Sequence, residues 1–575
     1  MKERVSGAGA GRLPSGQDSD GDGMNGLMME APLLISGLIN RADRHHGDTE
    51  IVSRSGTGMT HRSDYTELHA RCRKLALALR RLGVDSRDRI ASLAWNGFRH
   101  LECYYAVSGI GAIMHTVNPR LFPEQIAWIL NDAEDVMLCF DRDLLPLVEQ
   151  LVPHLTSVRH FVMMGEKNEA QISKAICDLH FYEDLLEAES AEFEWPCLDE
   201  RSASGLCYTS GTTGNPKGVL YHHRSTMLHA LLTAMPDMMN LSARDVVMPV
   251  VPMFHVNAWG LPYSCALVGA KQVLPGPLLD GKSLYELIDS EGVTLSAGVP
   301  TVWAGLLDYM EAYGLKFKVP PRIVIGGSAC PPSMMRRFEN NHGVQVLHAW
   351  GMTEMGPIGT ICTFKAKHEG WTTEQKQQVL MKAGRPHFGV EMKILDGQGN
   401  ELPRDGEAFG DLLVRGPCIM SAYFKGAGGD PLKDGWFPTG DVATIDADSY
   451  IQITDRSKDV IKSGGEWISS IELENIAISH PAIQEVAAIG IAHEKWGERP
   501  LLIAVRRTDL AVSEDELLAW YEGKVASFWK PDGVIFVEQL PHTATGKLSK
   551  LSLRKQYSDY LPRRSVSSKH LPSQE

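Results

Sequence analysis

The stretch Tyr208-Thr-Ser-Gly-Thr-Thr-Gly-Asn-Pro-Lys-Gly-Val219 combines glycines, hydroxyl side chains and a single lysine in one short segment. It follows directly on Ser204-Gly-Leu-Cys-Tyr208, a run typical of a short buried strand. A loop that leaves a sheet edge in this way can present backbone N–H groups as a concave anion-binding site. The stretch therefore predicts a polyphosphate-binding loop, with a plain glycine-rich surface loop as the alternative.

The Walker P-loop is the competing interpretation, because Gly211 and Lys217 have the spacing of the first glycine and the lysine in that motif. The Walker motif also needs glycine before the lysine, for close backbone approach, and Ser or Thr after it, for Mg²⁺. Those places are taken by Pro216 and Gly218. Since proline has no N–H to donate, the phosphate cradle must be built differently.

Size and composition narrow the class of protein. The chain has 575 residues, more than the roughly 250–300 at which a single core stops growing, so at least two domains are expected. With 57 basic and 71 acidic residues, the net charge of −14 favours solubility and argues against nucleic acid as a partner. The 10 cysteines form no CxxC pair, which suits unpaired thiols in a reducing cytoplasm.

Two segments resemble targeting signals but lack their features. The uncharged run Val246–Ala270 is long enough to suggest a transmembrane helix, yet Pro249, Pro252 and Pro262 interrupt it. Residues 1–29 are rich in Gly, Ser and Asp and contain no apolar core of a signal peptide. We expect no membrane span, and a disordered leader over 1–29.

The region before about residue 455 alternates between helical and strand-like patterns. Asp64 and Glu67 form a capping box for a helix that ends at Gly83. Strand-like apolar runs recur at Arg89–Ala94, Val136–Phe140, Val246–Val250, Arg322–Gly326 and Val344–His348. This alternation predicts a layered α/β architecture.

After about residue 455 the elements become small enough for a separate domain. The charged turn Asp455–Asp459 leads to a hairpin signal at Ser463-Gly-Gly465. The expected elements beyond it are a helix capped by Ser469 or Ser470 and ending near Ile478, apolar runs at Glu485–Ala492 and Pro500–Val505, and a helix around Glu514–Val525.

Three further segments contain residue types that suit nucleotide binding or catalysis. Trp350-Gly-Met-Thr-Glu354 joins an aromatic face, a hydroxyl and a carboxylate, which suit a base, a phosphate and Mg²⁺; a loop with one capping threonine is the alternative. Gly435-Trp-Phe-Pro-Thr-Gly-Asp441 places a carboxylate where it can bridge ribose hydroxyls, and a turn aspartate is the commoner explanation. Pro541–Lys547 presents a lysine that taken alone is an ordinary surface lysine.

These segments, in this order, resemble the AMP-forming acyl-adenylating enzymes, in their acyl-CoA ligase branch. The resemblance extends over about residues 30–560 and includes Val251–Gly260, Gly326–Ala329, Asp455–Asp459, Ser463–Ile468 and Thr545–Lys547. The variants Phe254-His-Val-Asn-Ala-Trp259 and Gly464-Gly-Glu-Trp467 are most similar to medium- and long-chain fatty acid–CoA ligases and to 3-methylthiopropionate–CoA ligases.

The resemblance implies an α/β fold in which a large N-terminal adenylation domain of several subdomains (30–457) precedes a small, mobile α+β C-terminal lid domain (458–562) and a tail (563–575). It also implies a reaction in which a carboxylate attacks the α-phosphate of ATP and releases pyrophosphate. The thiol of coenzyme A then displaces AMP. The implied cofactors and substrates are ATP, Mg²⁺, coenzyme A and a carboxylic acid. Similar enzymes are often homodimers.

The same resemblance implies roles for individual residues. For the nucleotide and the metal these are Thr209, Ser210, Gly211, Thr212, Thr213, Gly214 and Lys217 at the β/γ-phosphates, Thr209 and Glu354 at Mg²⁺, Gly327, Ser328, Ala329 and Trp350 around adenine, Thr353 at the α-phosphate, Asp441 with Arg456 at the ribose, and Lys462 on the cofactor side. Lys547 stabilises the charge that develops at the α-phosphate and acyl carboxylate. Lys458 is the implied hinge, and a rotation there brings Gly464, Gly465 and Trp467 to the coenzyme A side.

The acyl pocket is expected around His255, Trp259 and Gly327. The first two lie in a segment without carboxylates or cations, so the acid's tail should be apolar and carry no second charge. In long-chain relatives a tryptophan in the place of Trp259 resembles a gate, and a core aromatic is the alternative.

Some positions depart from the family pattern. Trp350 stands where many relatives have tyrosine, although an indole stacks on adenine equally well. Ser449 replaces an expected glycine and strains its turn if φ is positive there. Phe528–Pro531 and Gly533 also vary, which leaves the coenzyme A side less defined than the ATP side.

The sequence therefore predicts a cytoplasmic acid–CoA ligase for a medium- or long-chain fatty acid. The alternative substrate is 3-methylthiopropionate. An adenylation module that loads a carrier protein and a nucleotide-binding regulator built on the same fold are the remaining alternatives. No appended carrier domain is found in the chain, and Lys547, Glu354 and Asp441 are all present, which argues against an inactive regulator.

Overall fold

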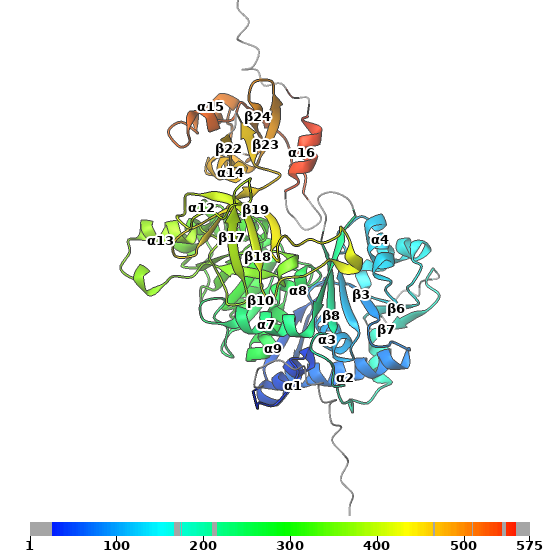
Figure 1. Cartoon of the computed structure of the whole chain (residues 1–575). Helices are drawn as coiled ribbons and strands as arrows, with labels where there is room; N and C mark the ends of the chain where they lie inside the picture. The colour runs from blue at the N-terminus through cyan, green and yellow to red at the C-terminus, as the bar shows by residue number, and fades with distance from the viewer. Residues whose placement is uncertain are drawn as a thin grey trace, which may run out of the picture.

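The computed structural model describes residues 26–165, 173, 175–209, 215–463, 466–508, 510–542, 548–558 and 560. A large N-terminal body carries a smaller C-terminal domain above it (Figure 1). In the described part of the chain no helix combines the length and apolar character needed to cross a membrane.

The first sheet has seven strands and supports the predicted phosphate loop. Its order is β7 (Leu179–Phe181), β6 (His160–Met164), β5 (Met137–Asp141), β3 (Arg89–Leu93), β4 (Ile113–Val117), β8 (Ala203–Thr209) and β9 (Lys217–His222). Every pair is parallel except β8–β9. The connecting helices are α2 (Tyr65–Arg81), α3 (Phe98–Gly109), α4 (Pro123–Ala133), α5 (Leu145–Leu151) and α6 (Tyr182–Glu187).

The second sheet has nine strands in the order β16 (Arg385–Pro386), β15 (Ile358–Ile361), β14 (Gln345–Gly351), β13 (Arg322–Ile325), β12 (Leu295–Gly298), β10 (Val246–Pro249), β11 (Lys271–Leu274), β1 (Glu50–Arg54) and β2 (Thr60–Asp64). Its helices are α1 (Ile35–His46), α7 (His223–Ala234), α8 (Val256–Trp259), α9 (Leu261–Val268), α10 (Gly281–Glu291), α11 (Pro300–Ala312), α12 (Pro332–Arg336) and α13 (Thr373–Leu380). The centre is parallel and the ends are antiparallel.

One buried cluster joins these two sheets. It includes Leu38 of α1, Leu75 of α2, Tyr104 of α3, Cys265 of α9 and Val324 of β13. Because α1, α2, α3 and α9 contribute to the same core, the two sheets form one packed body.

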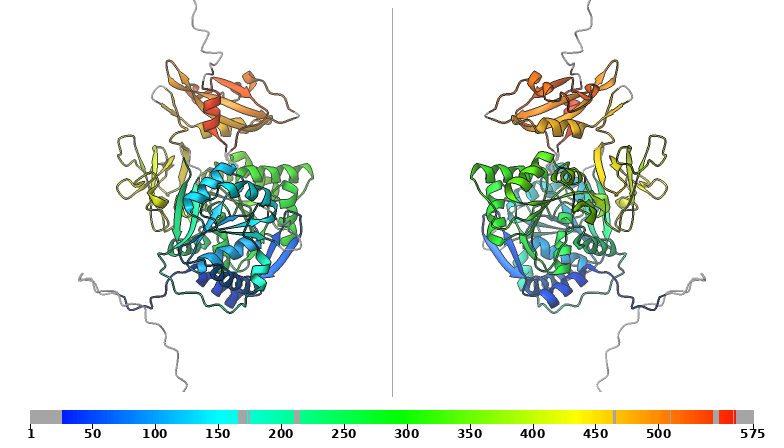
Figure 2. Two further views of the ribbon diagram at one scale, coloured as in Figure 1. Left: turned by 90° about the vertical axis from the view of Figure 1, so that its right-hand side faces the viewer. Right: turned by 90° about the vertical axis from the view of Figure 1, so that its left-hand side faces the viewer.

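A third, antiparallel sheet of four strands lies on one flank of the body (Figure 2). Its strands are β17 (Glu391–Leu395), β18 (Phe409–Arg415), β19 (Phe437–Ile445) and β20 (Ile451–Arg456).

The C-terminal domain has a five-stranded sheet with buried side chains on both faces. Its elements are β21 (Ile461–Ser463), β22 (Glu466–Ile468), α14 (Ser470–Ile478), β23 (Ile483–His493), β24 (Gly497–Arg506), α15 (Glu514–Ala519), β25 (Gly533–Phe536) and α16 (Lys550–Gln556). Leu502 packs in a cluster with Leu473 of α14, whereas Leu501 packs in a second cluster with Leu553 of α16.

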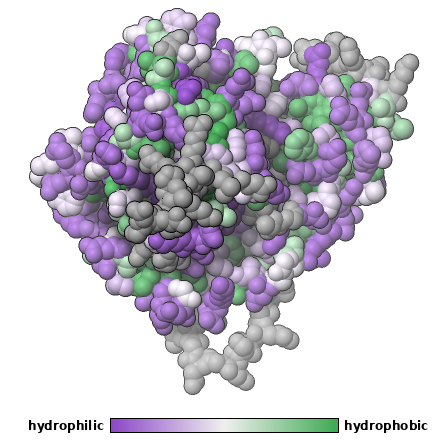
Figure 3. All heavy atoms as spheres, turned by 90° about the horizontal axis from the view of Figure 1, so that it is seen from above, coloured by the Kyte–Doolittle hydropathy of each residue, from purple (hydrophilic) through white to green (hydrophobic). Residues whose placement is uncertain are grey.

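Most predicted elements are confirmed. The Asp64 carboxylate accepts the N–H of Glu67 and begins α2, and Ser469 caps α14 through the N–H of Glu472. The run Val246–Ala270 is divided among β10, α8 and α9 and is therefore no membrane helix. The surface seen from above is mostly hydrophilic, as the net charge predicts (Figure 3).

Two predictions need correction. The helix expected over Glu514–Val525 ends at Ala519, because the buried Tyr521 turns inward and donates a hydrogen bond to the carbonyl of Leu473 at 2.6 Å. The segment Trp350–Glu354 is not one turn: strand β14 continues through Gly351, and only Thr353 and Glu354 enter the short 3₁₀ helix η5 (Thr353–Met355).

The turn that joins β19 to β20 is strained at Ser449. Its φ is +68°, a conformation in which a Cβ meets the neighbouring carbonyl. We expect Ser449→Gly to raise the free energy of unfolding by about 0.5–1 kcal/mol, since relief of that clash exceeds the entropy cost of glycine. Chemical denaturation of the purified protein measures the change. Ala447→Gly, in the same turn but without positive φ, should lower stability, and equal effects of the two substitutions would contradict the strain.

Candidate functional site

The predicted phosphate loop connects the last residue of β8 to the first residue of β9. Thr209 pairs with Lys217 across this antiparallel hairpin, so the two residues frame the loop. Lys217 Nζ lies 4.8 Å from the centre of the Tyr423 ring. Gly428 has φ of +83°, which favours glycine, and a Cβ there would lie 2.5 Å from the same Nζ, so another residue would displace the lysine end. The predicted phosphate ligands Ser210, Gly211, Thr212, Thr213 and Gly214 lie outside the described residues.

Thr353 and Glu354 are buried beside this hairpin, on η5. The hydroxyl of Tyr221, on β9, donates to the Thr353 carbonyl at 2.6 Å. The hydroxyl of Tyr423 donates to Glu354 Oε1 at 2.8 Å, and the N–H of Met420 donates to the Glu354 carbonyl at 2.9 Å. Tyr423 thus orients the Glu354 carboxylate, and Met420 fixes the backbone of the same residue. Its oxygens and the Thr209 hydroxyl are hard donors, which fit Mg²⁺.

Trp350, Asp441 and Arg456 form a connected set. Trp350 Nε1 donates to Asp441 Oδ2 at 2.9 Å, and Arg456 Nε lies 2.7 Å from Asp441 Oδ1. Asp441 on β19 and Arg456 on β20 are register partners. Asp441 is only 2% exposed, and the contacts with Trp350 and Arg456 hold its carboxylate in place.

Gly327, Ser328 and Ala329 follow the carboxyl end of β13, next to the end of β14 that carries Trp350. Gly327 has φ of +81°, and Ser328 and Ala329 are exposed. In parallel α/β sheets, ligands bind in the crevice outside the carboxyl ends of the strands. The predicted adenine and ribose residues therefore lie on adjoining elements.

The acyl segment adopts a backbone that the sequence does not predict. Val256, Asn257, Ala258 and Trp259 all have positive φ, from +46° to +57°, so α8 is a single left-handed turn. Asn96 holds the chain just before it: its Nδ2 donates to the carbonyls of Pro249 and Val251 at 2.8 and 2.9 Å, and its Oδ1 accepts the N–H of Met253 at 2.7 Å. Consecutive left-handed residues cost free energy and mark functional segments.

Trp259 is buried at the end of this turn, whereas His255 before it is partly exposed. A Cβ at Gly326 would lie 3.2 Å from the Trp259 ring, so the indole covers the strand end that leads to Gly327. Trp259 also belongs to the large buried cluster, which agrees with a core aromatic as well as with a gate.

A small cavity lies beside Tyr221, whose hydroxyl donates to the Thr353 carbonyl. Its lining residues are Tyr221, Ser225, Thr226, His229, Asn257, Gly260, Tyr263 and Gly356, none of which is an Asp, Glu, Lys or Arg. Burial lowers the pKa of His229 to about 3, so its ring is neutral. His229 Nε2 accepts the N–H of Ile358 at 3.0 Å. The volume of about 10 Å³ is roughly the space of one water.

The remaining predicted residues lie at the junction with the C-terminal domain. Burial, with help from Arg456 and Arg554, lowers the pKa of Lys458. Lys462 and Trp467 face each other across the β21–β22 hairpin, and the Trp467 ring lies 5.7 Å from that of Phe409 on β18. Gly464, Gly465 and Lys547 lie outside the described residues.

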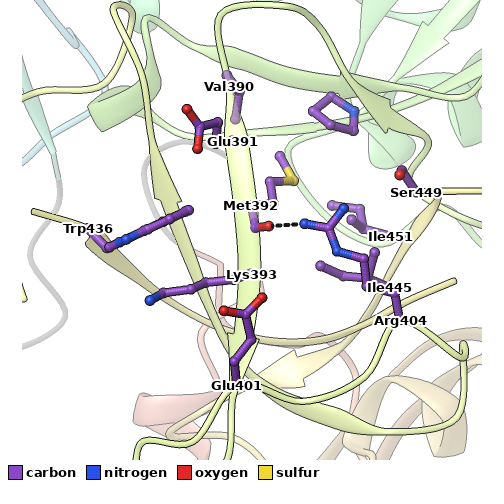
Figure 4. Close-up of a pocket in the computed structure, with 11 residues that line it drawn as sticks. Val390, Glu391, Met392, Lys393, Glu401, Arg404, Trp436, Ile445, Ser449 and Ile451 are labelled. Carbon is purple, nitrogen blue, oxygen red and sulfur yellow. Dashed lines mark hydrogen bonds between the residues drawn. The ribbon is translucent and has the colours of Figure 1, made fainter. Parts of the chain in front are cut away.

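A second cavity, of about 400 Å³, opens between strands of the four-stranded sheet. Arg404 crosses it and donates a hydrogen bond to the carbonyl of Met392 at 2.8 Å (Figure 4). Its lining residues include none of the predicted site residues.

The sequence did not predict three residues that form hydrogen bonds to the segments of the candidate site: Asn96, Tyr221 and Tyr423. Each acts on a segment far along the chain; Tyr221 and Thr353, for example, are 132 residues apart. Their residue types carry no motif, so no local pattern indicates these contacts.

Comparison with known proteins assigns most of the chain to one family. The family model for AMP-binding enzymes matches residues 38–424, and the model for the AMP-binding enzyme C-terminal domain matches residues 472–547. A 3-methylmercaptopropionyl-CoA ligase of Ruegeria lacuscaerulensis is 54% identical, over 94% of this chain and 100% of that protein. A medium-chain-fatty-acid–CoA ligase of Ectopseudomonas oleovorans is 52% identical, over 95% and 100%.

The crystal structure of the anthranilate CoA ligase AuaEII in complex with anthranoyl-AMP has the same fold, with a TM-score of 0.81, 24% identity and coverage of 92% of this chain and 98% of that one. The predicted fold class, a large N-terminal adenylation domain with a small C-terminal domain, is confirmed. ATP, Mg²⁺ and coenzyme A are the predicted requirements of this reaction class. The chain belongs to the AMP-binding enzymes and is an AMP-forming acyl-CoA ligase.

Proposed function

We propose that this ligase activates a medium- or long-chain fatty acid. The observation that carries the proposal is the cavity beside Tyr221, whose lining contains neither a carboxylate nor a cation and whose histidine is neutral. A second charge on the acid's tail would be buried there without a partner, at a cost of several kcal/mol. An uncharged alkyl tail meets no such penalty.

We assign the chemistry of the first half-reaction to the residues of the β8–β9 hairpin and of η5, together with Lys547. Thr209, Lys217 and the loop between them bind the β/γ-phosphates, and Thr353 binds the α-phosphate. Glu354 and Thr209 hold Mg²⁺, which neutralises phosphate charge when bound. Support comes from the hairpin that frames the loop and from the tyrosines that orient Thr353 and Glu354. Lys547 then stabilises the charge that develops as the carboxylate attacks and pyrophosphate leaves.

The nucleoside is assigned to the adjoining strand ends. Trp350 stacks on adenine with Gly327, Ser328 and Ala329 around it, and Asp441 accepts the ribose hydroxyls. Trp350 Nε1 and Arg456 Nε hold the two oxygens of Asp441, and a carboxylate is the kind of acceptor that suits ribose hydroxyls. Lys462 contributes from the C-terminal side.

The second half-reaction needs the small domain to move. We propose that 458–562 rotates about Lys458, withdraws Lys547 and brings Gly464, Gly465 and Trp467 toward the thiol, with 30–457 as the fixed part, 1–29 as a leader and 563–575 as a tail. Support comes from the position of Lys458 between β20 and β21, where one short connection joins the flank of the body to the C-terminal sheet. The domain as a whole lies above the body (Figure 2).

A short thioether acid, 3-methylthiopropionate, is the second candidate substrate. The cavity of about 10 Å³ has room for roughly one water, so either acid requires neighbouring side chains to move, and the shorter tail requires less movement. The relative that is 54% identical is named for the same acid.

An acid series tests these proposals. Purified protein with ATP, Mg²⁺ and coenzyme A should form AMP with monocarboxylic acids, and the optimum between C3 and C18 separates a fatty acid from 3-methylthiopropionate. Dicarboxylic acids of the same lengths are the matched control and should be poor substrates. Acyl transfer to free coenzyme A without a carrier protein would exclude a carrier-loading module. If no acid supports coenzyme-A-dependent AMP formation, the proposed function is wrong.

The proposed gate at Trp259 leads to a separate prediction. We expect Trp259→Ala to shift the preferred acid to longer chains, because removing the indole opens the space beside Gly326. The kcat/KM ratio for a long and a short acid measures this shift. Loss of a buried tryptophan costs about 3–5 kcal/mol of stability, so Trp259→Phe serves as the milder variant. If kcat/KM falls equally for all acids, the indole acts only as part of the core.

Cytoplasmic location and a homodimer complete the proposal. The unpaired cysteines support a reducing compartment, because eight of the ten are buried as free thiols. Light scattering on the purified protein measures the oligomeric state directly.

A further inference from the structure

Two histidines and an aspartate converge at the edge of the seven-stranded sheet. His160 Nδ1 lies 2.6 Å from Asp178 Oδ2, and His180 Nε2 lies 3.1 Å from the same oxygen. One ligand atom from each of the three residues lies within 4.8 Å of the others. Strands β6 and β7 are at the margin of the body in Figure 1, and β7 pairs only with β6.

The sheet register explains why these side chains meet. In the parallel pair β6–β7, Val162 is the partner of His180, and Phe161 is the partner of Leu179. His160 precedes Val162 by two residues and Asp178 precedes His180 by two, so all three point to the same face. The N–H of Phe161 also donates to the Asp178 carbonyl at 3.0 Å, which fixes the approach of the two strands.

Hydrogen bonding within the protein does not satisfy this cluster. His180 Nε2 is buried, and despite its distance of 3.1 Å from Asp178 Oδ2 it lacks the alignment of a hydrogen bond with any described group. A buried nitrogen without a partner is uncommon and calls for a missing water or ion. The Asp178 oxygen, in turn, faces two imidazole nitrogens at once.

We propose that His160, Asp178 and His180 form a binding site for a divalent cation of the Zn²⁺ type. Two imidazoles and one carboxylate are a common donor set for three-ligand zinc sites, whose fourth position is left to water. Bond lengths of about 2.0–2.2 Å place tetrahedral ligand atoms about 3.3 Å apart, so the two distances from the Asp178 oxygen, 2.6 and 3.1 Å, have to widen by less than about 1 Å. Imidazole ligands also disfavour Mg²⁺, which takes oxygen ligands.

The site is separate from the ligase chemistry. His160 is the first residue of β6 and Thr209 is the last residue of β8, and all strands from β6 to β8 in the sheet are parallel. The two positions thus lie at opposite ends of the strands. A bound cation would tie β7 to β6 and stabilise this margin of the body, whatever acid the enzyme activates.

Calorimetric titration of Zn²⁺ into the chelator-treated, full-length protein, without ATP, tests the site. Cys177 and Cys197, the exposed cysteines of the described chain, are first replaced by serine so that thiols do not compete for Zn²⁺. We expect one equivalent of Zn²⁺ to bind, with no competition from Mg²⁺. His160→Asn and His180→Asn should each weaken binding by at least about tenfold. The exposed His154→Asn, in the same subdomain, is the control and should bind as before.

Thermal unfolding with and without Zn²⁺ separates ligation from structural damage. The unfolding midpoint of the parent protein should rise with Zn²⁺, whereas the midpoints of the two histidine variants should not respond. If either variant fails to fold, Asp178→Asn replaces it. Absence of Zn²⁺ binding, or binding of equal affinity in the parent and in the histidine variants, would overturn the proposal.

Discussion

Lys547→Ala is expected to slow adenylate formation by about 10²–10³-fold while ATP still binds. The lysine is proposed to act on charge that develops only in the transition state, and loss of one such preorganised donor has an effect of this size. Pyrophosphate release measures the first half-reaction, and calorimetry measures ATP affinity. The second half-reaction, started from a synthetic acyl-adenylate and coenzyme A, should keep its rate because the lysine is withdrawn by then.

Lys555→Ala is the matched control for this lysine. Lys555 is exposed in the last turn of α16, in the same C-terminal segment, and its loss should leave both half-reactions unchanged. Unchanged pyrophosphate release in Lys547→Ala would contradict the proposed role of Lys547. It would not contradict the ligase assignment, which rests on the comparison over the whole chain.

Glu354→Gln is expected to lower kcat/KM for ATP by about 10²-fold and to raise the Mg²⁺ concentration that gives half the maximal rate. The amide keeps the size of the side chain but loses the charge that attracts a hard cation. Initial rates over a Mg²⁺ series measure both effects. If the variant keeps the parent's Mg²⁺ dependence, Glu354 is no metal ligand.

Tyr423→Phe tests the orientation of the same carboxylate. Burial, together with Glu354, raises the pKa of Tyr423, so the phenol stays protonated and donates to Glu354 Oε1. Removing a hydrogen bond to a charged group costs about 1.5–3 kcal/mol, and we expect a loss of about tenfold in rate that is smaller than that of Glu354→Gln. A loss as large as that of Glu354→Gln would indicate that the tyrosine itself contacts the nucleotide.

Local patterns predicted much of the fold because they depend on residues close in sequence. The cap at Asp64, the cap at Ser469 and the Ser463-Gly-Gly465 hairpin signal all involve neighbours within a few positions. The helix after Glu514 was predicted too long, since Tyr521 is drawn inward by Leu473, a residue 48 positions away. The periodicity of apolar residues within one segment does not predict a contact with such a distant residue.

The candidate site likewise contains residues that local patterns predicted and others that they did not predict. The residues that we propose to face the ligands lie in short motifs of the sequence, such as Trp350–Glu354 and Thr439–Asp441. The left-handed turn at Val256–Trp259 has no local signal, because none of its four residues is glycine and only the packing around Asn96 and Trp259 stabilises that backbone.

By itself, the stretch Tyr208–Val219 predicted a polyphosphate-binding loop, and Pro216 and Gly218 excluded a Walker loop. Together with the motifs that contain Glu354, Asp441 and Lys547 it supported the resemblance to acyl-CoA ligases, because each motif consists of a few neighbouring side chains. Only the tertiary structure decided which tyrosines contact Thr353 and Glu354, that the cavity beside Tyr221 has an uncharged lining, and that His160, Asp178 and His180 meet at a sheet edge. Those features depend on strand register and packing between distant segments, which no single stretch of sequence encodes.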